Sequence, residues 1–178
     1  IHNWYYIFSR DVLYIYLRFI PINLYLMSTK IVTNTILIRS TLHRVWDVLT
    51  KPEYTKVYMF GCETISDWKE GSPLLWNGQY EGKEVTFVSG HILDINPPHR
   101  LIYSVIDPNA PYDKTPANHL KVLYELKENG DDVEFKVSQY GFEDAADGEK
   151  RYKEIYNNGD GWQPILVAIK ELIENQGN

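Results

Sequence analysis

The sequence contains a single cysteine, Cys62, among its 178 residues. One thiol cannot form an internal disulfide and cannot supply the several cysteine ligands of a structural zinc site. The five histidines show neither the i, i+4 helical spacing nor the accompanying cysteines of a metal motif, and they are His2, His43, His91, His99 and His119. We therefore expect no metal and no other cofactor, and a reducing, cytoplasmic location.

Motifs for nucleotide binding and for nucleophilic catalysis are also missing. The chain has no G-x-G-x-x-G, no P-loop and no G-x-S-x-G segment. Its 18 Lys and Arg residues are scattered and are outnumbered by 24 Asp and Glu, which gives a net charge of -6. Because an acidic chain without a basic patch does not attract a phosphate backbone, we expect no nucleic-acid partner.

The first 26 residues differ in composition from the rest of the chain. They hold eight aromatic residues and no Gly, Ala, Glu or Lys, whereas Met27 begins an ordinary mixed sequence. We interpret residues 1–26 as a leader that is not part of the natural protein, and residues 27–178 as a single domain. A membrane-contacting segment and a real structural element are the alternatives. Charged residues and a proline interrupt the run of about 20 apolar residues that a spanning helix needs, so membrane insertion is not expected.

Hydrophobic periodicity from residue 30 onward predicts an α+β fold. Residues 31–39 alternate as a strand, and an apolar i, i+3, i+4, i+7 pattern over residues 42–49 predicts a helix that ends before Pro52. Further segments of strand length lie between turn signals, at residues 74–80, 85–95, 101–106, 119–127 and 132–140. In the last two, apolar and polar residues alternate strictly, which is typical of an antiparallel sheet with one buried face.

The C-terminal region supplies a helix that could cover this sheet. Between residues 160 and 175 the apolar side chains recur at helical spacing, and they are Trp162, Ile165, Leu166, Ile169, Leu172 and Ile173. Charged residues such as Lys170 and Glu171 fall outside this stripe. The pattern predicts two layers, with the apolar face of the sheet packed against a long final helix.

Three short segments occur in an order that is informative. They are Val45-Trp46 followed by Pro52-Glu53, the stretch Gly90–Leu101 that contains Pro97-Pro98, and Gly161-Trp162 at the start of the final helix. Together they resemble the START-like (SRPBCC) superfamily, and within it the branch of homologues of the heat-shock chaperone ATPase activator, over about residues 29–176. The resemblance implies a helix-grip fold, in which a curved antiparallel sheet of about six to seven strands wraps a long C-terminal helix and leaves an apolar cavity. Members include lipid carriers, polyketide cyclases and chaperone activators, so the fold does not fix the function.

Seven residues are predicted to form a ligand site in that cavity. Aromatic side chains would be its walls, and they are Trp76, Tyr80, Tyr103, Tyr124 and Trp162. His91 and Gln139 would be its polar groups, because each falls on an otherwise apolar strand face where an unpartnered polar group is costly. Each residue has a structural alternative, as a packed core aromatic or as a polar group satisfied by neighbouring protein atoms. Asn34 on the first strand has the same alternatives.

Three functions of different classes fit this sequence. We expect a protein that binds a small apolar or aromatic molecule in the cavity, and we assign no catalytic residue. One alternative is an enzyme of the cyclase or dehydratase type that uses His91 or a tyrosine as general acid or base. The other is a chaperone ATPase-activating partner protein. That alternative is weaker, because its eukaryotic two-domain counterpart has a further domain that is not found here.

Overall fold

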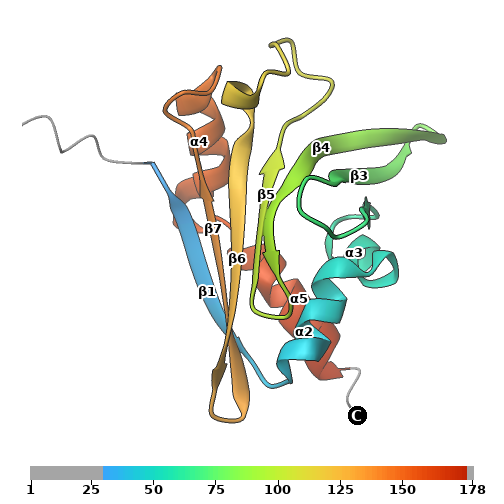
Figure 1. The fold of residues 1–178 in the computed structure, drawn as a ribbon, viewed down its shortest axis with the longest axis vertical. Helices are drawn as coiled ribbons and strands as arrows, with labels where there is room; N and C mark the ends of the chain where they lie inside the picture. Colours follow the sequence, from blue (N-terminus) through green and yellow to red (C-terminus); the bar gives the residue numbers. More distant parts are fainter. Residues whose placement is uncertain (1–29, 176–178) are drawn as a thin grey trace, which may run out of the picture.

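The structure, a computed structural model, describes residues 30–175. The leader inferred at residues 1–26 lies outside the described residues. Seven antiparallel strands form one curved sheet in the order β1-β7-β6-β5-β4-β3-β2, and helix α5 runs along its inner side (Figure 1). The predicted α+β helix-grip architecture is confirmed. No helix between residues 30 and 175 has the length and apolar character needed to cross a membrane.

The elements follow one another in a simple order. They are β1 (Val32–Ile38), α2 (Leu42–Thr50), α3 (Pro52–Tyr58), β2 (Glu63–Ile65), β3 (Pro73–Tyr80), β4 (Lys83–Asn96), β5 (Arg100–Val105), β6 (Leu120–Asn129), β7 (Asp132–Tyr140), α4 (Gly148–Tyr156) and α5 (Gln163–Asn175). Two short 3-10 turns, Pro116–Asn118 and Asn157–Gly159, precede β6 and α5.

Helices α2 and α3 are separated by a proline. The Thr41 hydroxyl caps α2 by accepting a hydrogen bond from the backbone N–H of Arg44 at 3.3 Å. Pro52 has no backbone N–H to donate into a continuing helix, so α2 ends and the proline occupies the first turn of α3. The expected helix over residues 42–49 is therefore present, and the chain after it forms a second, separate helix.

The inner face of the sheet and helix α5 share one core. Alternate residues of β6 and β7 point inward and are buried, among them Val122, Tyr124, Phe135 and Val137. On α5 the buried residues are Leu166, Ile169 and Ile173, while Ile165 and Leu172, together with Trp162 just before the helix, are partly buried against the same core. The helical spacing in the sequence thus identified the covering face of α5 correctly.

Strand β4 contains a first β-bulge near its start. Trp76 of β3 pairs with Val88, but the next residue, Asn77, pairs with Thr86. Phe87 is the extra residue, so both Phe87 and Val88 reach the inner side of the sheet.

A second bulge in β4 reverses the alternation again. Ile92 pairs with Tyr103 of β5, whereas Asp94 pairs with Ile102, which leaves Leu93 as the extra residue. Between the two bulges it is therefore Ile92 that is buried, and Ile95 after the second bulge packs on the core. The side chains of β4 therefore do not alternate between the two faces of the sheet in one uninterrupted pattern.

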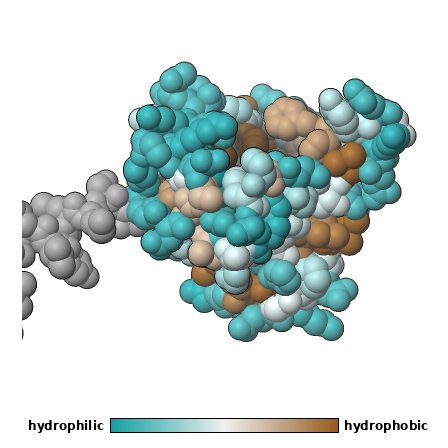
Figure 2. Space-filling view, turned by 90° about the horizontal axis from the view of Figure 1, so that it is seen from above, coloured by the Kyte–Doolittle hydropathy of each residue, from teal (hydrophilic) through white to brown (hydrophobic). Residues whose placement is uncertain are grey.

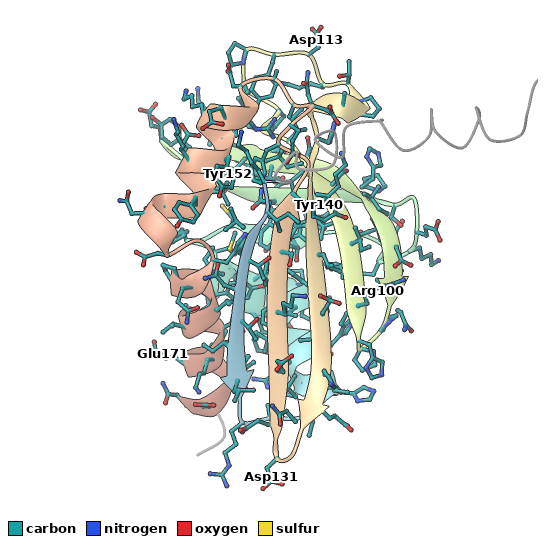
Figure 3. All side chains as sticks on the ribbon, turned by 90° about the vertical axis from the view of Figure 1, so that its left-hand side faces the viewer. Arg100, Asp113, Asp131, Tyr140, Tyr152 and Glu171 are labelled. Carbon is teal, nitrogen blue, oxygen red and sulfur yellow. The ribbon has the colours of Figure 1, made fainter. Side chains whose placement is uncertain are left out.

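Helix α4 covers the upper end of the sheet beside β1. Its Tyr152 packs edge-to-face on the buried Phe142 at a ring-centroid distance of 5.4 Å. Figure 3 shows α4 above α5 at the β1 side of the sheet, with polar side chains on the outer face of the strands. The two helices meet at the turn that leads to Trp162, and this junction forms one wall of the site.

Candidate functional site

A hollow of about 440 Å³ lies between the inner face of the sheet and the start of α5. The segment after α3 contributes Met59, Phe60 and Cys62 to its wall. The sheet contributes Trp76, Gln79, Phe87 and Val88 from β3 and β4, and Tyr103, Val105, Val122 and Gln139 from β5 to β7. The helical side contributes Ile155 and Trp162. The volume falls within the range of about 300 to 1,000 Å³ that is usual for small-molecule sites. Figure 2 shows apolar surface exposed between two hydrophilic lobes at this upper end of the molecule.

Four of the seven residues predicted for the site line this hollow, and they are Trp76, Tyr103, Gln139 and Trp162. Tyr124 stands behind them. It is buried, it accepts a hydrogen bond from the Tyr103 hydroxyl at 2.8 Å, and its ring meets that of Trp162 edge-to-face at 6.4 Å. Tyr124 therefore supports the wall and does not form its surface.

Tyr80 does not line the hollow, and the expectation that it would is wrong. It is the last residue of β3 and is 60 % exposed. Its alternation with Trp76 is as expected, but it lies at the tip of the β3–β4 hairpin, where β4 pairs with β3 alone. Figure 1 shows this hairpin extending beyond the end of β5. Nothing in the described chain covers the tip, so the inward side is open there.

His91 also lies outside the hollow, and its expected inward placement is wrong. The side chain is exposed, while its neighbour Ile92 is buried. The cause is the extra residue at Phe87, which shifts the alternation by one position before His91 is reached. His91 cannot act as a polar group or as an acid or base in this cavity.

A chain of hydrogen bonds fixes the start of α5 against the sheet. Asn34 of β1 accepts from the backbone N–H of Trp162 at 2.8 Å and donates to the carbonyl of Asp160 at 3.1 Å. The indole N–H of Trp162 then donates to Oε1 of Gln139 at 3.1 Å. Asn34 is thus a polar group satisfied by neighbouring protein atoms. Gln139 is also bonded to protein, but it lines the hollow at the same time.

Three tyrosine hydroxyls are buried beneath the hollow, those of Tyr58, Tyr103 and Tyr124. Burial raises the pKa of Tyr124 to about 12, although the hydrogen bond from Tyr103 lowers it in part. Burial also raises the pKa values of Tyr58 and Tyr103 well above the ordinary tyrosine value, and the neighbouring Tyr124 adds to both shifts. All three hydroxyls are therefore neutral at physiological pH.

We expect the free energy of unfolding to fall as the pH rises above about 10. Tyrosines of the unfolded chain ionise near pH 10, whereas the buried ones keep their protons, so the unfolded state binds fewer protons in this range. The stability is fully present below pH 10 and is lost as the pH rises through about 12 for Tyr124. Each such group contributes at most about 1.4 kcal/mol per pH unit, once it is fully ionised in the unfolded chain. Urea unfolding at pH 9, 10 and 11 measures the slope, and Tyr124→Phe should reduce it by about half a proton on average over this range, because tyrosine in the unfolded chain is half ionised at about pH 10. An unchanged slope in that variant would show that Tyr124 ionises normally.

The segment after α3 forms a rim that sequence patterns did not reveal. Phe60 lines the hollow, is 89 % exposed and has φ of +55°, a left-handed conformation that is uncommon for a bulky residue. Met59 and Cys62 line the hollow beside it. A loop of this kind has no hydrophobic period, so an exposed aromatic in a short loop was the only available signal.

The described lining of the hollow includes no His, Asp, Glu, Lys or Arg. Burial raises the pKa of the Cys62 thiol, so it is protonated and a poor nucleophile at neutral pH. Within residues 30–175, no group of three or more His, Cys, Asp or Glu side chains is arranged to hold a metal ion. The arrangement is suited to contact an apolar or aromatic molecule and to hydrogen-bond it at a few points.

A smaller hollow of about 220 Å³ adjoins the first one. Both share Val88, Val105, Gln139 and Ile155, so Gln139 lies where they meet. The smaller hollow has a polar wall with three charged side chains, Asp107, Arg151 and Glu154. An apolar compartment and a polar one thus adjoin at the Gln139 amide.

Comparison with known proteins gives one family for this chain. The family described as "Activator of Hsp90 ATPase homolog 1-like protein" matches residues 39–174, which include every strand and helix from α2 to the last turn of α5. No curated protein matches the sequence.

Solved structures share the fold over most of the chain. A protein from Cytophaga hutchinsonii, ChR145, is 33 % identical, with a TM-score of 0.65 over 82 % of this chain and 94 % of its own. A Nitrosomonas europaea protein is 18 % identical, with a TM-score of 0.62 over 83 % and 96 %. The Aha1 dimer from Colwellia psychrerythraea is 11 % identical, with a TM-score of 0.58 over 81 % and 96 %. The last two likenesses concern the fold alone.

Proposed function

The chain belongs to the family of Activator of Hsp90 ATPase homolog 1-like proteins, and on that premise we propose that it binds a small apolar or aromatic molecule in the hollow between the sheet and the start of α5. The observation that carries the proposal is the hollow itself, about 440 Å³ with mainly apolar and aromatic walls. Transfer of an apolar molecule from water to such walls is favourable by about 25 cal/mol per Å² of apolar surface removed from water.

Rigid walls favour binding further. Trp162 is held at both its backbone and its indole N–H, and Tyr103 is bonded to Tyr124 behind it. Ring contacts continue from Tyr124 to Phe135 at 5.2 Å, deep in the core. A preformed site loses little side-chain entropy when a ligand enters, which leaves more of the contact energy for affinity.

Binding is better supported than catalysis at this site. General acid or base catalysis needs a group whose pKa lies near the working pH. The described lining has no histidine or carboxylate, His91 is on the opposite face of β4, and burial raises the pKa values of Tyr103 and Cys62. The cyclase or dehydratase alternative therefore lacks the acid or base that it was expected to use.

Activation of Hsp90 is named in the description of the family and stays an alternative for this chain. It would need a protein-docking surface, whereas the feature supporting our proposal is an internal hollow.

The thiol of Cys62 is free, which supports the proposed cytoplasmic location.

A variant that fills the hollow tests the proposal. Val105 of β5 is only partly buried and lines both hollows, so the larger ring of Val105→Phe should enter empty space. We expect it to weaken binding of 2-ethylnaphthalene, measured by equilibrium dialysis, at least about tenfold. The melting temperature should not fall by more than a few degrees. Ile102→Phe, on the outer face of the same strand, is the matched control and should bind normally.

Two results would contradict this account. One is that the wild-type protein does not bind the probe at all, and the other is that both variants bind it as the wild type does. Either result would mean that the hollow is not a ligand site for such molecules.

A further inference from the structure

The side-chain amide of Gln139 has an orientation that its neighbour dictates. Nε1 of Trp162 lies 3.1 Å from Oε1 of Gln139, and an indole N–H can only donate. The amide must therefore present its oxygen to Trp162 and direct its two N–H donors elsewhere. Because Asn34 holds the backbone of Trp162 at 2.8 Å, this orientation is present before any ligand arrives.

The amide nitrogen of Gln139 is accessible where the two hollows meet. It makes no hydrogen bond with residues 30–175, although Gln139 is only 4 % exposed. Among those residues, the side-chain polar atoms that are sealed from solvent and make no hydrogen bond are the Tyr58 hydroxyl and one oxygen of Asp94, which instead forms an ion pair with Arg100. The Gln139 nitrogen is not in this sealed group, so it is reached from the adjoining hollows that the residue lines.

Trp76 provides a second donor of the same kind. Its side chain is buried and lines the hollow, and its indole N–H makes no hydrogen bond within the described part of the chain. A ligand that displaces water from these donors without replacing its hydrogen bonds would be penalised. The hollow therefore favours a ligand with an acceptor that faces Gln139 or Trp76.

The charges around the hollow disfavour an anion. No charged side chain among residues 30–175 lines it. In the adjoining smaller hollow, Arg151 is accompanied by the carboxylates of Asp107 and Glu154, and it already donates to the carbonyl of Asn118 at 2.8 Å. A carboxylate or phosphate brought to Gln139 would lose its water shell without gaining an unopposed counter-charge.

We propose that Gln139 is the specificity-determining residue of this hollow, and that it selects a neutral aromatic ligand bearing a hydrogen-bond acceptor such as a carbonyl oxygen. This inference rests on the proposed function and concerns the same hollow. The acceptor binds Nε2 of Gln139, and the apolar body of the ligand lies against Trp76, Tyr103 and Trp162.

Three probes that share a naphthalene ring test the preference for an acceptor and the preference for a neutral ligand separately. They are 2-acetylnaphthalene with a neutral acceptor, 2-ethylnaphthalene without one, and 2-naphthoate, which is an anion at pH 7.5. Equilibrium dialysis gives the Kd of each for the wild type, for Gln139→Met and for Gln163→Met. Gln163, the first residue of α5, lines neither hollow, so its variant is the matched control.

We expect the ratio of the Kd of 2-ethylnaphthalene to that of 2-acetylnaphthalene to fall about three- to tenfold in Gln139→Met, the usual effect of one hydrogen bond. It should not change in Gln163→Met, and 2-naphthoate should bind the wild type at least about tenfold more weakly than 2-acetylnaphthalene. An unchanged ratio in Gln139→Met, or tight binding of 2-naphthoate, overturns this inference while the proposed function stands. Binding of none of the probes to the wild type overturns both.

A measurement on the wild type keeps the test valid if Gln139→Met does not fold. The side-chain NH₂ resonances of Gln139 in a ¹⁵N NMR spectrum should move downfield with 2-acetylnaphthalene and much less with 2-ethylnaphthalene. Equal shifts with both probes would show that the amide does not bind the carbonyl oxygen.

Discussion

Gly90→Ala is expected to destabilise the protein by at least about 3 kcal/mol, among the largest effects that a single substitution produces. A Cβ at this position would lie 1.7 Å from the backbone oxygen of Ser104 on the adjacent strand β5. A backbone atom cannot rotate away as a side chain can, so β4 and β5 would have to separate. Ser104 also accepts a hydrogen bond from the backbone N–H of His91 at 3.0 Å, and this contact would be disturbed too.

Urea unfolding measures this effect, and Gly82→Ala is its control. A Cβ at Gly82 would meet nothing within 4 Å, but φ is +76°, so only the backbone strain of about 1 kcal/mol applies. Equal losses in the two variants would show that the close approach of β4 to β5 is not what requires glycine at position 90.

Ile169→Ala should lower the free energy of unfolding by about 2 to 5 kcal/mol, as buried isoleucine truncations do. Ile169 is 1 % exposed and packs in the core that α5 shares with the sheet. It does not line the hollow, so ligand binding by the folded variant should be retained.

The control for this variant lies on the outer side of the same helix. Val167 is 38 % exposed, and Val167→Ala should change the stability by less than about 1 kcal/mol. Urea unfolding of both variants gives the comparison. If Ile169→Ala proved as mild as Val167→Ala, the packing of α5 against the sheet would be wrong.

The parts of the fold that sequence patterns predicted well are those with an undisturbed period. Strands β6 and β7 alternate strictly, and α5 keeps its apolar stripe from Trp162 to Ile173, so both buried faces were correct. Elements with a weak apolar pattern were not predicted. Strand β2 has only three residues, and α4 is largely polar with Gly148 as its one buried residue.

The candidate site was harder to predict because it depends on irregular structure. Bulges shift the alternation in β4 by one residue each, which moved His91 outward and brought Val88 inward. The rim at Phe60 comes from a loop with no period at all. Gln139, on a regular strand, was placed by counting, but counting cannot reveal that it bonds to Trp162. Tyr103 lies in a segment that is apolar on both faces, so counting could not decide its side.

The most direct test of ligand binding in the hollow uses the tryptophans as built-in probes. Trp76 and Trp162 line the hollow, whereas Trp46 and Trp68 pack on the core elsewhere. In a ¹⁵N NMR titration with 2-ethylnaphthalene, with indole signals assigned from single Trp→Phe variants, we expect the indole N–H signals of Trp76 and Trp162 to move and saturate together. Those of Trp46 and Trp68 should stay in place. Shifts at Trp46 or Trp68 with none at Trp76 and Trp162, or no saturable shift at any of the four, would contradict the account.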